Sequence, residues 1–420
     1  MKWFSKLSSD SQCGIEKIKM RRCFLIIILF IALNAIVLPN AQQVMLAVAL
    51  VVGAIVASYY KITITQLALV LIGLSWLVTM LYIVVGAIHG APIQAAVQTI
   101  FIYMVSPALW LIVIDRAWKT LGVDKIVQSF AVLAAIAAAS VAVYMFLFLN
   151  FGPQAVAVFG SRANVHIESG YSGVIMHVSG SLIFLGAAFA SSPSILPSRL
   201  FGILILFALA LACIASGRTL AIGGLIVGAA FHFLSNPSTI LKRLFTTLPL
   251  FAVLGFGILQ SMDFLLDVDV VQLLNRHLNK AVSGDVERPA QIAALMRGAE
   301  ETWFLGAGHG IGVDYIRSTD FPWRYESVFF ALIYKLGIVG TLVLCLPLIY
   351  SIALFLTRQI RGAARKYDAF FGSALVAVTL AANTNPYPEA FTFQWMFLIP
   401  IYYFISTRDS ASLNPVRGQT

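Results

Sequence analysis

The composition of this 420-residue chain excludes an ordinary soluble domain. Hydrophobic residues make up 60% of the sequence, charged residues make up 11%, and the mean hydropathy is +0.90. Soluble domains carry about 25% charged residues, so this composition indicates a polytopic membrane protein. The sequence shows no internal repeat and no stretch that could form a soluble domain, so we expect a single transmembrane domain over residues 1–420.

A helix that crosses the membrane needs roughly 20 apolar residues, because a rise of about 1.5 Å per residue must cover about 30 Å of hydrocarbon. Twelve stretches meet or approach this length. We therefore predict an all-α polytopic membrane protein with about 12 transmembrane helices. The predicted spans are 24–39, 41–60, 66–87, 93–114, 127–150, 171–190, 199–216, 219–235, 244–261, 326–357, 369–384 and 389–406.

The basic residues predict the orientation of these spans, because Lys and Arg concentrate in cytoplasmic segments. With the N-terminus in the cytoplasm, 19 of the 28 basic residues fall inside and 8 outside, with Lys335 left within a span. Both termini are then cytoplasmic, and two loops, 151–170 and 262–324, face outward. The net charge of +10 reflects this topology and attraction to lipid headgroups, so it does not indicate nucleic-acid binding.

The N-terminal segment and the cysteines add little chemistry. "KIKMRR" precedes the first span with no small-residue cleavage site after it, which predicts a start-transfer anchor rather than a cleaved signal peptide. No cysteine lies in an outer loop, so we expect no disulfide framework. The cysteines lack zinc-ligand spacing and the six histidines are scattered, so we expect no metal site.

The outer loop 262–324 is the one long polar stretch of the chain, and we expect the chemistry there. Within it, "RPAQIAALMRGAEE" predicts a short helix with apolar residues at 289, 292, 293, 295 and 296 and a polar face that includes Arg297. Asp285 is a candidate cap for this helix. The segment "LGAGHGIG" that follows holds Gly306, Gly308 and Gly310 around His309, which predicts a tight loop whose N–H groups can approach an anion.

Two further arginines are candidate anion ligands. Arg218, in "ASGRTLAIGG", separates two apolar runs near the outer surface. It is either a turn arginine that reaches the headgroups or an anion ligand, and the short turn favours the second interpretation. Arg162 lies in the other outer loop, where a solvated surface cation is the simpler interpretation.

Glu326 is the strongest single candidate. It follows "PWRY" and begins the apolar run "SVFFALIYKLGIVG", which places a carboxylate at the membrane surface close to Arg324. A carboxylate at a helix N-terminus often only balances the helix dipole. The surrounding arginines make a general base an equally good interpretation.

These segments together resemble a known family. "SGR" between two spans, "GDVER" in the long loop, "WFLGAGHGIG" and "YESVFFALIYKLGIVG" resemble the O-antigen ligase and O-antigen polymerase (Wzy-type) superfamily of bacterial inner-membrane proteins. The match covers about residues 200–345. The resemblance implies a GT-C-like fold that transfers glycans from undecaprenyl-diphosphate carriers at the periplasmic face without a metal, a nucleotide or another cofactor.

The resemblance also assigns residues. Arg218 and Arg288 match the diphosphate-binding arginines of the family, and Glu326 stands where ligases usually carry histidine. This difference favours a polymerase of O-antigen, capsule or exopolysaccharide repeat units, with Glu326 catalytic. Arg162 is a third candidate diphosphate ligand. The implied partners are a lipid-linked glycan, membrane lipid and a chain-length regulator. The remaining candidate substrate-loop residues are Arg297, Gly306, Gly308, His309, Gly310 and Arg324.

The chemistry supports this assignment independently. Transfer from a lipid diphosphate needs cations for the charge that develops on the leaving group, and it needs a base for the incoming sugar hydroxyl. The aromatic residues Trp303, Tyr315, Trp323 and Tyr325 offer faces for sugar rings or, equally, form an interfacial belt.

Two alternatives remain at the level of sequence. An O-antigen ligase that transfers glycan to lipid A core would use the same arginines. A lipid-linked glycan transporter should instead carry ionisable groups deep in several spans and related halves, and the predicted spans hold almost none.

Overall fold

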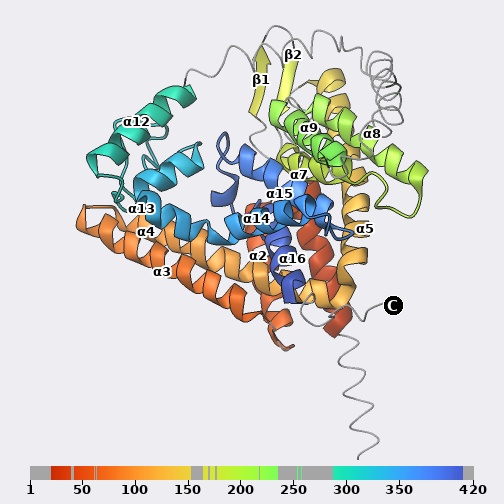
Figure 1. The fold of residues 1–420 in the computed structure, drawn as a ribbon. Helices are drawn as coiled ribbons and strands as arrows, with labels where there is room; N and C mark the ends of the chain where they lie inside the picture. Colours follow the sequence, from red (N-terminus) through yellow and green to blue (C-terminus); the bar gives the residue numbers. More distant parts are fainter. Residues whose placement is uncertain are drawn as a thin grey trace, which may run out of the picture.

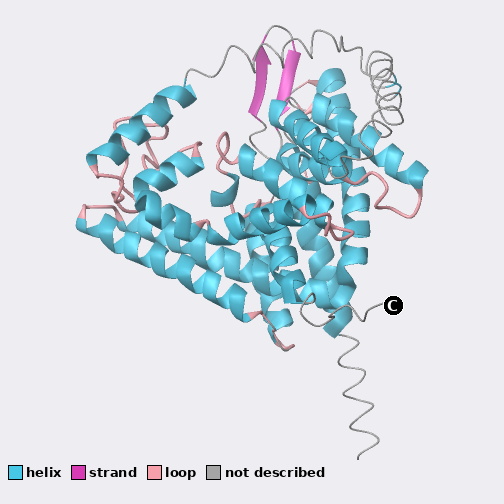
Figure 2. Cartoon of the chain, in the orientation of Figure 1, coloured by secondary structure: helices cyan, strands magenta, loops and turns pink. Residues whose placement is uncertain are grey.

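The computed structural model describes residues 20–38, 42–60, 62, 64–152, 164–168, 171–175, 177–216, 218–234, 253, 257 and 287–409. Helices make up most of this part of the chain, as Figure 2 shows. The strands in the described residues form one antiparallel hairpin of β1 (Asn164–Glu168) and β2 (Tyr171–Ile175). The predicted span 171–190 is therefore wrong at its start, because β2 occupies its first residues and the helix begins at His177.

Figure 1 shows how the helices are arranged. The first helical segment is Met20–Val37, which ends in the π-helix η1 (Leu33–Val37). The others are α2 (Gln43–Ser58), α3 (Gln66–Ile88), α4 (Ile93–Ile100), η2 (Phe101–Val105), α5 (Ser106–Phe151), α7 (His177–Ser191), α8 (Arg199–Ala215), α9 (Thr219–Leu234), α12 (Glu287–Glu301), α13 (Val328–Leu344), α14 (Leu346–Ile360), α15 (Asp368–Ala381), η4 (Tyr387–Glu389) and α16 (Trp395–Asp409).

The predicted number of about 12 transmembrane helices is wrong for the described part of the chain. Three helical runs there are long and apolar enough to cross a membrane, namely Met20–Val37, Gln66–Ile88 and Ile93–Phe148. The pair α13 and α14, bent by 47°, makes a fourth if it counts as one span. Five of the expected spans are instead apolar helices of 10–17 residues, which at about 1.5 Å per residue fall short of a full crossing. The expected span 244–261 lies outside the described residues.

The exposed surface of the long helices is apolar, as a surface in contact with lipid should be. On α3, Leu77, Leu81 and Val84 are more than half exposed. The interior is built around α7, every residue of which is buried from Val178 to Ser191. The described chain is therefore an α-helical membrane protein with a packed centre and a lipid-facing rim.

Two glycines fix the position of α9 against α7. A Cβ atom added to Gly224 would lie 2.6 Å from the carbonyl oxygen of Ile183, and one added to Gly228 would lie 2.3 Å from that of Ala187. This is the small-residue spacing that lets membrane helices pack backbone to backbone. The close packing sets where α9 begins, and Arg218 stands immediately before that helix.

The glycine loop 305–312 is inserted into a break in α13. Gly337 has φ 65°, so the helix cannot continue its own hydrogen bonds there. The N–H of Ala307 donates to the carbonyl of Tyr334 (2.9 Å), and that of Gly308 donates to Lys335 (2.9 Å). In return, the N–H of Ile338 donates to Phe304 (3.1 Å). The loop thereby ties α12 to α13 and fixes the chain between them.

Candidate anion site at the junction of α12, α13 and the η4 turn

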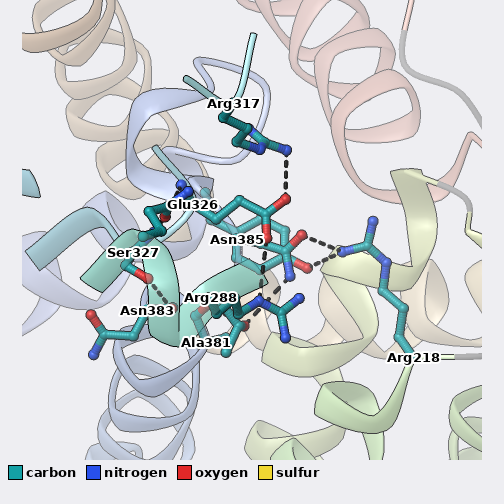
Figure 3. A network of polar contacts seen from close by, with 11 residues as sticks. Arg218, Arg288, Arg317, Glu326, Ser327, Ala381, Asn383 and Asn385 are labelled. Carbon is teal, nitrogen blue, oxygen red and sulfur yellow. Dashed lines mark hydrogen bonds and ion pairs between the residues drawn. The ribbon is translucent and has the colours of Figure 1, made fainter. Parts of the chain in front are cut away.

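Glu326 lies directly before α13 and accepts hydrogen bonds from two arginines. Arg288 on the first turn of α12 donates through Nε to Oε2 at 3.2 Å, and Arg317 donates through Nη2 to Oε1 at 2.5 Å. Figure 3 shows the two guanidinium groups reaching the carboxylate from different sides. The side chains are partly exposed, at 22% for Glu326, 35% for Arg288 and 38% for Arg317. The pairs therefore stand at an accessible surface rather than in the core.

The backbone around Glu326 is held by a buried amide. Gln291 of α12 accepts hydrogen bonds at its Oε1 from the N–H groups of Glu326 (2.9 Å) and Ser327 (3.0 Å). The hydroxyl of Ser327 donates to the carbonyl of Asn383 after α15 (3.3 Å). These bonds fix the position of Glu326 relative to three elements.

Arg218 approaches the same site from the start of α9. Its Nη1 donates to the hydroxyl of Tyr387 at 2.5 Å and to Oδ1 of Asn385 at 3.3 Å. Its Nε is buried and has no hydrogen-bond partner among the described residues. The buried Nε–H is therefore an unused donor, which an anion could occupy.

The electrostatics of Tyr387 place the arginines and Glu326 in one cluster. Burial raises the pKa of the Tyr387 hydroxyl. The positive charges of Arg218 and Arg288 act in the opposite direction, and Glu326 adds to the increase. All three charges act on the pKa of the same hydroxyl, so Arg218, Arg288 and Glu326 lie close enough to interact electrostatically. We call Arg218, Arg288, Arg317 and Glu326 the arginine cluster.

The structure leaves other predicted residues outside this cluster. Arg297 lies on the exposed face of α12, nine residues after Arg288 and so about 13 Å farther along the axis at about 1.5 Å per residue. The guanidinium of Arg324 instead lies over the ring of Phe321, 5.4 Å from its centroid. Arg162 and Asp285 lie outside the described residues.

The helix α12 was predicted, but its buried face was not. Ala293, expected on the apolar side, is exposed, while the polar Gln291 is buried. The buried stripe consists of Gln291, Ala294, Leu295, Gly298 and Ala299. The amide of Gln291 is drawn inward because it accepts the N–H groups of Glu326 and Ser327, a role that hydrophobic periodicity cannot reveal.

The glycine loop has a structural role that differs from the predicted anion contact. The N–H groups of Ala307, Gly308 and His309 all donate to protein carbonyls, so they are not available to a ligand. The glycines permit close packing: a Cβ atom on Gly308 would lie 2.2 Å from the nitrogen of Gly86, and one on Gly306 would lie 2.6 Å from that of Gly337. A Cβ atom on Gly310 would lie 2.6 Å from that of Ala95.

His309 itself is buried, with only 3% of its surface exposed. Its ring lies beside that of Tyr103, with centroids 5.5 Å apart. Burial, with a smaller contribution from the charge of Lys335, lowers the pKa of His309 to about 3. The side chain is therefore a neutral, enclosed group that does not face an approaching sugar.

Lys335, which interrupts the apolar sequence of α13, has a buried partner. Its Nζ lies 3.7 Å from Oε1 of Glu389, and both side chains are 5% exposed. Tyr103 donates to the same carboxylate oxygen at 2.7 Å. Glu389 ends the η4 turn whose first residue is Tyr387, so this buried pair anchors the turn that holds Arg218.

The aromatic residues proposed as sugar platforms differ in their exposure. Trp303 is 84% exposed. Trp323 and Tyr325 are buried, and Tyr325 accepts the N–H of Val313 at its hydroxyl (2.7 Å). Of these three, only Trp303 presents a free face.

Sequence reasoning missed Arg317, Asn385 and Tyr387. Arg317 lies in the long loop but was not singled out, because arginine alone carries no spacing signal. Asn385 and Tyr387 belong to "NTNPYPE", which the charge map places in an outer loop between two spans. The polarity of this segment, and its predicted position on the same side of the membrane as Arg218 and Glu326, could have identified it as part of the site.

The arrangement can bind an anion and accept a proton. Three guanidinium groups in one place suit a phosphate or diphosphate, since arginine binds such groups through paired N–H donors. Within the described residues, no group of three or more His, Cys, Asp or Glu side chains is placed to hold a metal ion.

In comparisons with known proteins, no family model matches this chain and no curated protein matches it.

Proposed function

We propose that the protein transfers a glycan from a polyprenyl-diphosphate carrier to a sugar hydroxyl at the outer face of the membrane. The observation that carries the proposal is the arginine cluster, in which Arg288 and Arg317 bind the carboxylate of Glu326 and Arg218 binds the hydroxyl of Tyr387. An anion that replaced Glu326 as the partner of Arg288 and Arg317 would be held by charge-assisted hydrogen bonds. The apolar helices next to the cluster suit a donor that stays in the membrane.

In the proposed mechanism the arginines bind the diphosphate of the donor. The acceptor hydroxyl oxygen attacks the anomeric carbon, and the bond from that carbon to the diphosphate oxygen breaks. The leaving diphosphate keeps the electron pair, and the arginines stabilise its added charge. The proton of the acceptor hydroxyl passes to Glu326.

The contacts of Glu326 suggest an order for these events. Both carboxylate oxygens accept hydrogen bonds from arginines, at 3.2 and 2.5 Å, so Arg288 and Arg317 are occupied by Glu326 before the donor binds. When the diphosphate binds, it takes over Arg288 and Arg317, and Glu326 becomes available as a base. The donor thus activates the base, which limits proton abstraction to the loaded site.

Among reactions of this class we favour polymerisation of polysaccharide repeat units. The basis is the resemblance to the O-antigen polymerase and ligase superfamily, together with glutamate at the position where ligases usually carry histidine. The enzyme would then be a bacterial inner-membrane polymerase whose site faces the periplasm.

The test is chain extension of purified lipid-linked repeat units by the wild-type protein and by Glu326→Gln in the same detergent. Glutamine keeps the shape but cannot take a proton, so the rate should fall by about 10²–10⁴-fold, the usual contribution of a general base. Glu300→Gln, on the exposed face of α12, is the matched control and should extend chains at the wild-type rate. A Glu326→Gln variant within about threefold of wild type would remove Glu326 from the mechanism.

A further inference from the structure

The arginine cluster has two sides that are supported by different elements. On the Glu326 side, Arg288 and Arg317 bind the carboxylate that lies directly before α13. On the Arg218 side, the guanidinium binds the hydroxyl of Tyr387, the first residue of the η4 turn. Figure 3 shows Arg218 approaching from a direction different from that of Arg288 and Arg317. The distance between the two sides therefore depends on how α13 and η4 are held against each other.

A buried ion pair connects these two elements. The Nζ of Lys335 on α13 and the Oε1 of Glu389 on η4 lie 3.7 Å apart, and both side chains are 5% exposed. Lys335 follows the first residue of α13 by seven positions, which corresponds to about 10 Å along the helix. Glu389 follows Tyr387 by two positions within the same turn. The pair thus joins the helix that begins after Glu326 to the turn that holds Arg218.

Neighbouring aromatic residues contact both members of the pair. The hydroxyl of Tyr103 on η2 donates to the same Oε1 of Glu389 at 2.7 Å. The Nζ of Lys335 lies 5.8 Å from the centroid of the Tyr325 ring, and Tyr325 immediately precedes Glu326 in the chain. The lysine therefore lies near the η4 turn and near the residue beside Glu326 at the same time.

The start of α13 is also attached to the chain that leads into η4. The hydroxyl of Ser327 donates to the carbonyl of Asn383 at 3.3 Å, and the N–H of Val328 donates to that of Ala382 at 3.4 Å. These contacts lie four or more residues before the turn begins. The ion pair supplies a second point of attachment within the turn itself, and two points fix the position of the turn along α13.

Stability alone does not account for a buried ion pair here. Removing two charges from water costs free energy that their attraction often does not recover, so apolar residues of similar size can stabilise a fold equally well. Burial of apolar groups is non-directional, whereas two opposite charges favour one short separation. An ion pair between Lys335 and Glu389 can therefore fix a distance that an apolar contact would leave adjustable.

We propose that the Lys335–Glu389 pair holds the Arg218 side of the cluster at the distance from the Glu326 side that a diphosphate can bridge. Both are positioning residues, because they act through α13 and η4. The inference rests on the proposed function for the identity of the ligand. A diphosphate has two phosphoryl groups and can contact both sides at once, whereas a monophosphate occupies one side. The pair thereby determines the preference of the site for a diphosphate over a monophosphate.

The test compares two ligands that differ by one phosphoryl group. Isothermal titration measures the binding of a short-chain isoprenoid diphosphate and of the corresponding monophosphate to the full-length protein in detergent. The variant Lys335→Met/Glu389→Leu replaces both charges with apolar side chains, so neither charge is left buried without its partner. Its affinity for the diphosphate should fall by about tenfold, and its affinity for the monophosphate should stay within about twofold of the wild-type value.

Two further variants test the pair itself. Lys335→Glu/Glu389→Lys restores an ion pair with the charges exchanged, and the preference for diphosphate should return to within about threefold of the wild-type value. Tyr103→Phe removes only the hydroxyl that donates to Glu389. It keeps both charges and the ring, so it guards against loss of the fold, and it should lower the preference for diphosphate by about threefold.

The matched control removes another lysine–carboxylate pair. The Nζ of Lys119 and the Oδ2 of Asp115, both on α5, lie 2.5 Å apart, and neither residue contacts the arginine cluster in the described structure. Lys119→Met/Asp115→Leu should leave the preference for diphosphate unchanged. Thermal melting of every variant reports whether it is folded.

The outcomes separate this inference from the proposed function. An unchanged preference in the apolar variant and in Tyr103→Phe, an equal loss of affinity for both ligands, or no recovery in the charge-exchanged variant would overturn the positioning role. None of these measurements needs glycan transfer. If the wild type binds the diphosphate but transfers no glycan, the proposed function fails and the titrations still decide the positioning role. If the wild type binds neither ligand, both fail.

Discussion

The two ends of the molecule use the same ion-pair chemistry in opposite ways. At the end away from the arginine cluster, Asp368 is fully buried and accepts hydrogen bonds from Arg358 (3.2 Å), Tyr403 (2.7 Å) and the N–H of Arg365 (3.0 Å). In the arginine cluster, the carboxylate of Glu326 is partly exposed and bound by two partly exposed arginines. Because it is buried, the Arg358–Asp368 pair is costly to break. The exposed pairs of Glu326 with Arg288 and Arg317 cost little to break, so these arginines can exchange partners.

The contacts around Asp368 join segments that the charge map places together in the cytoplasm. Lys366 binds Asp124 at 2.7 Å, and Arg21 donates to the carbonyl of Thr120 at 3.3 Å. Asp115, also buried, binds Lys119 at 2.5 Å and Tyr402 at 2.8 Å. These contacts connect the ends of helices to one another, so we assign them a structural role.

The largest predicted difference between the two ends is in stability. Asp368→Asn leaves the buried Arg358 without a full counter-charge and should lower the free energy of unfolding by about 3–5 kcal/mol. Glu326→Gln should lower it by at most about 1 kcal/mol, because its pairs are partly exposed. Denaturant titration in mixed micelles measures both. Equal losses would show that the two carboxylates play the same structural part.

The next largest effect concerns the arginines and transfer activity. Arg218→Lys and Arg288→Lys keep the charge but lose the planar fork, so each should lower the transfer rate by about 10²–10³-fold, the size of losing one transition-state donor. Arg358→Lys, at the opposite end, should impair stability instead. Full activity in both cluster variants would reduce Arg218 and Arg288 to packing residues. Each rate is measured as chain extension at matched amounts of folded protein.

The smallest predicted effect is a pH dependence at the glycine loop. Burial lowers the pKa of His309 to about 3, below the value of about 6.5 expected in the unfolded chain. As the pH falls, the unfolded state therefore takes up a proton on His309 before the folded state does. The free energy of unfolding is highest above about pH 6.5 and decreases as the pH falls below that value. Between about pH 7.5 and 5.5 the loss should be about 1.4 kcal/mol. His309→Phe should show a smaller loss than the wild type over that interval. An unchanged slope would show that His309 is not buried in its neutral form.

Sequence patterns predicted local features of this molecule well. The α12 helix, its exposed Arg297, and a carboxylate at the start of α13 all follow from nearby residues. The number of spans was overestimated, because hydropathy records that a segment is apolar without recording where its helix ends. The segment before α7 is an example: its first apolar residues form a strand.

The features that were not predicted depend on contacts between distant residues. Gly308 packs against Gly86, and Gln291 turns inward because it binds the backbone beside Glu326. Arg317 joins the cluster through Glu326, and Tyr387 contacts it through Arg218. None of these partners lies at a regular spacing in the sequence, so no period or motif could have linked them.

The central claim is that the arginines of the cluster exchange Glu326 for a diphosphate as their binding partner. Isothermal titration of a short-chain isoprenoid diphosphate into the wild-type protein, Arg288→Lys and Arg297→Lys tests it most directly. Both substitutions lie on α12, but the structure places only Arg288 against Glu326. The account predicts that Arg297→Lys binds as the wild type does and that Arg288→Lys binds at least about tenfold more weakly, a loss of roughly 1.4 kcal/mol. The same affinity for all three proteins would contradict it.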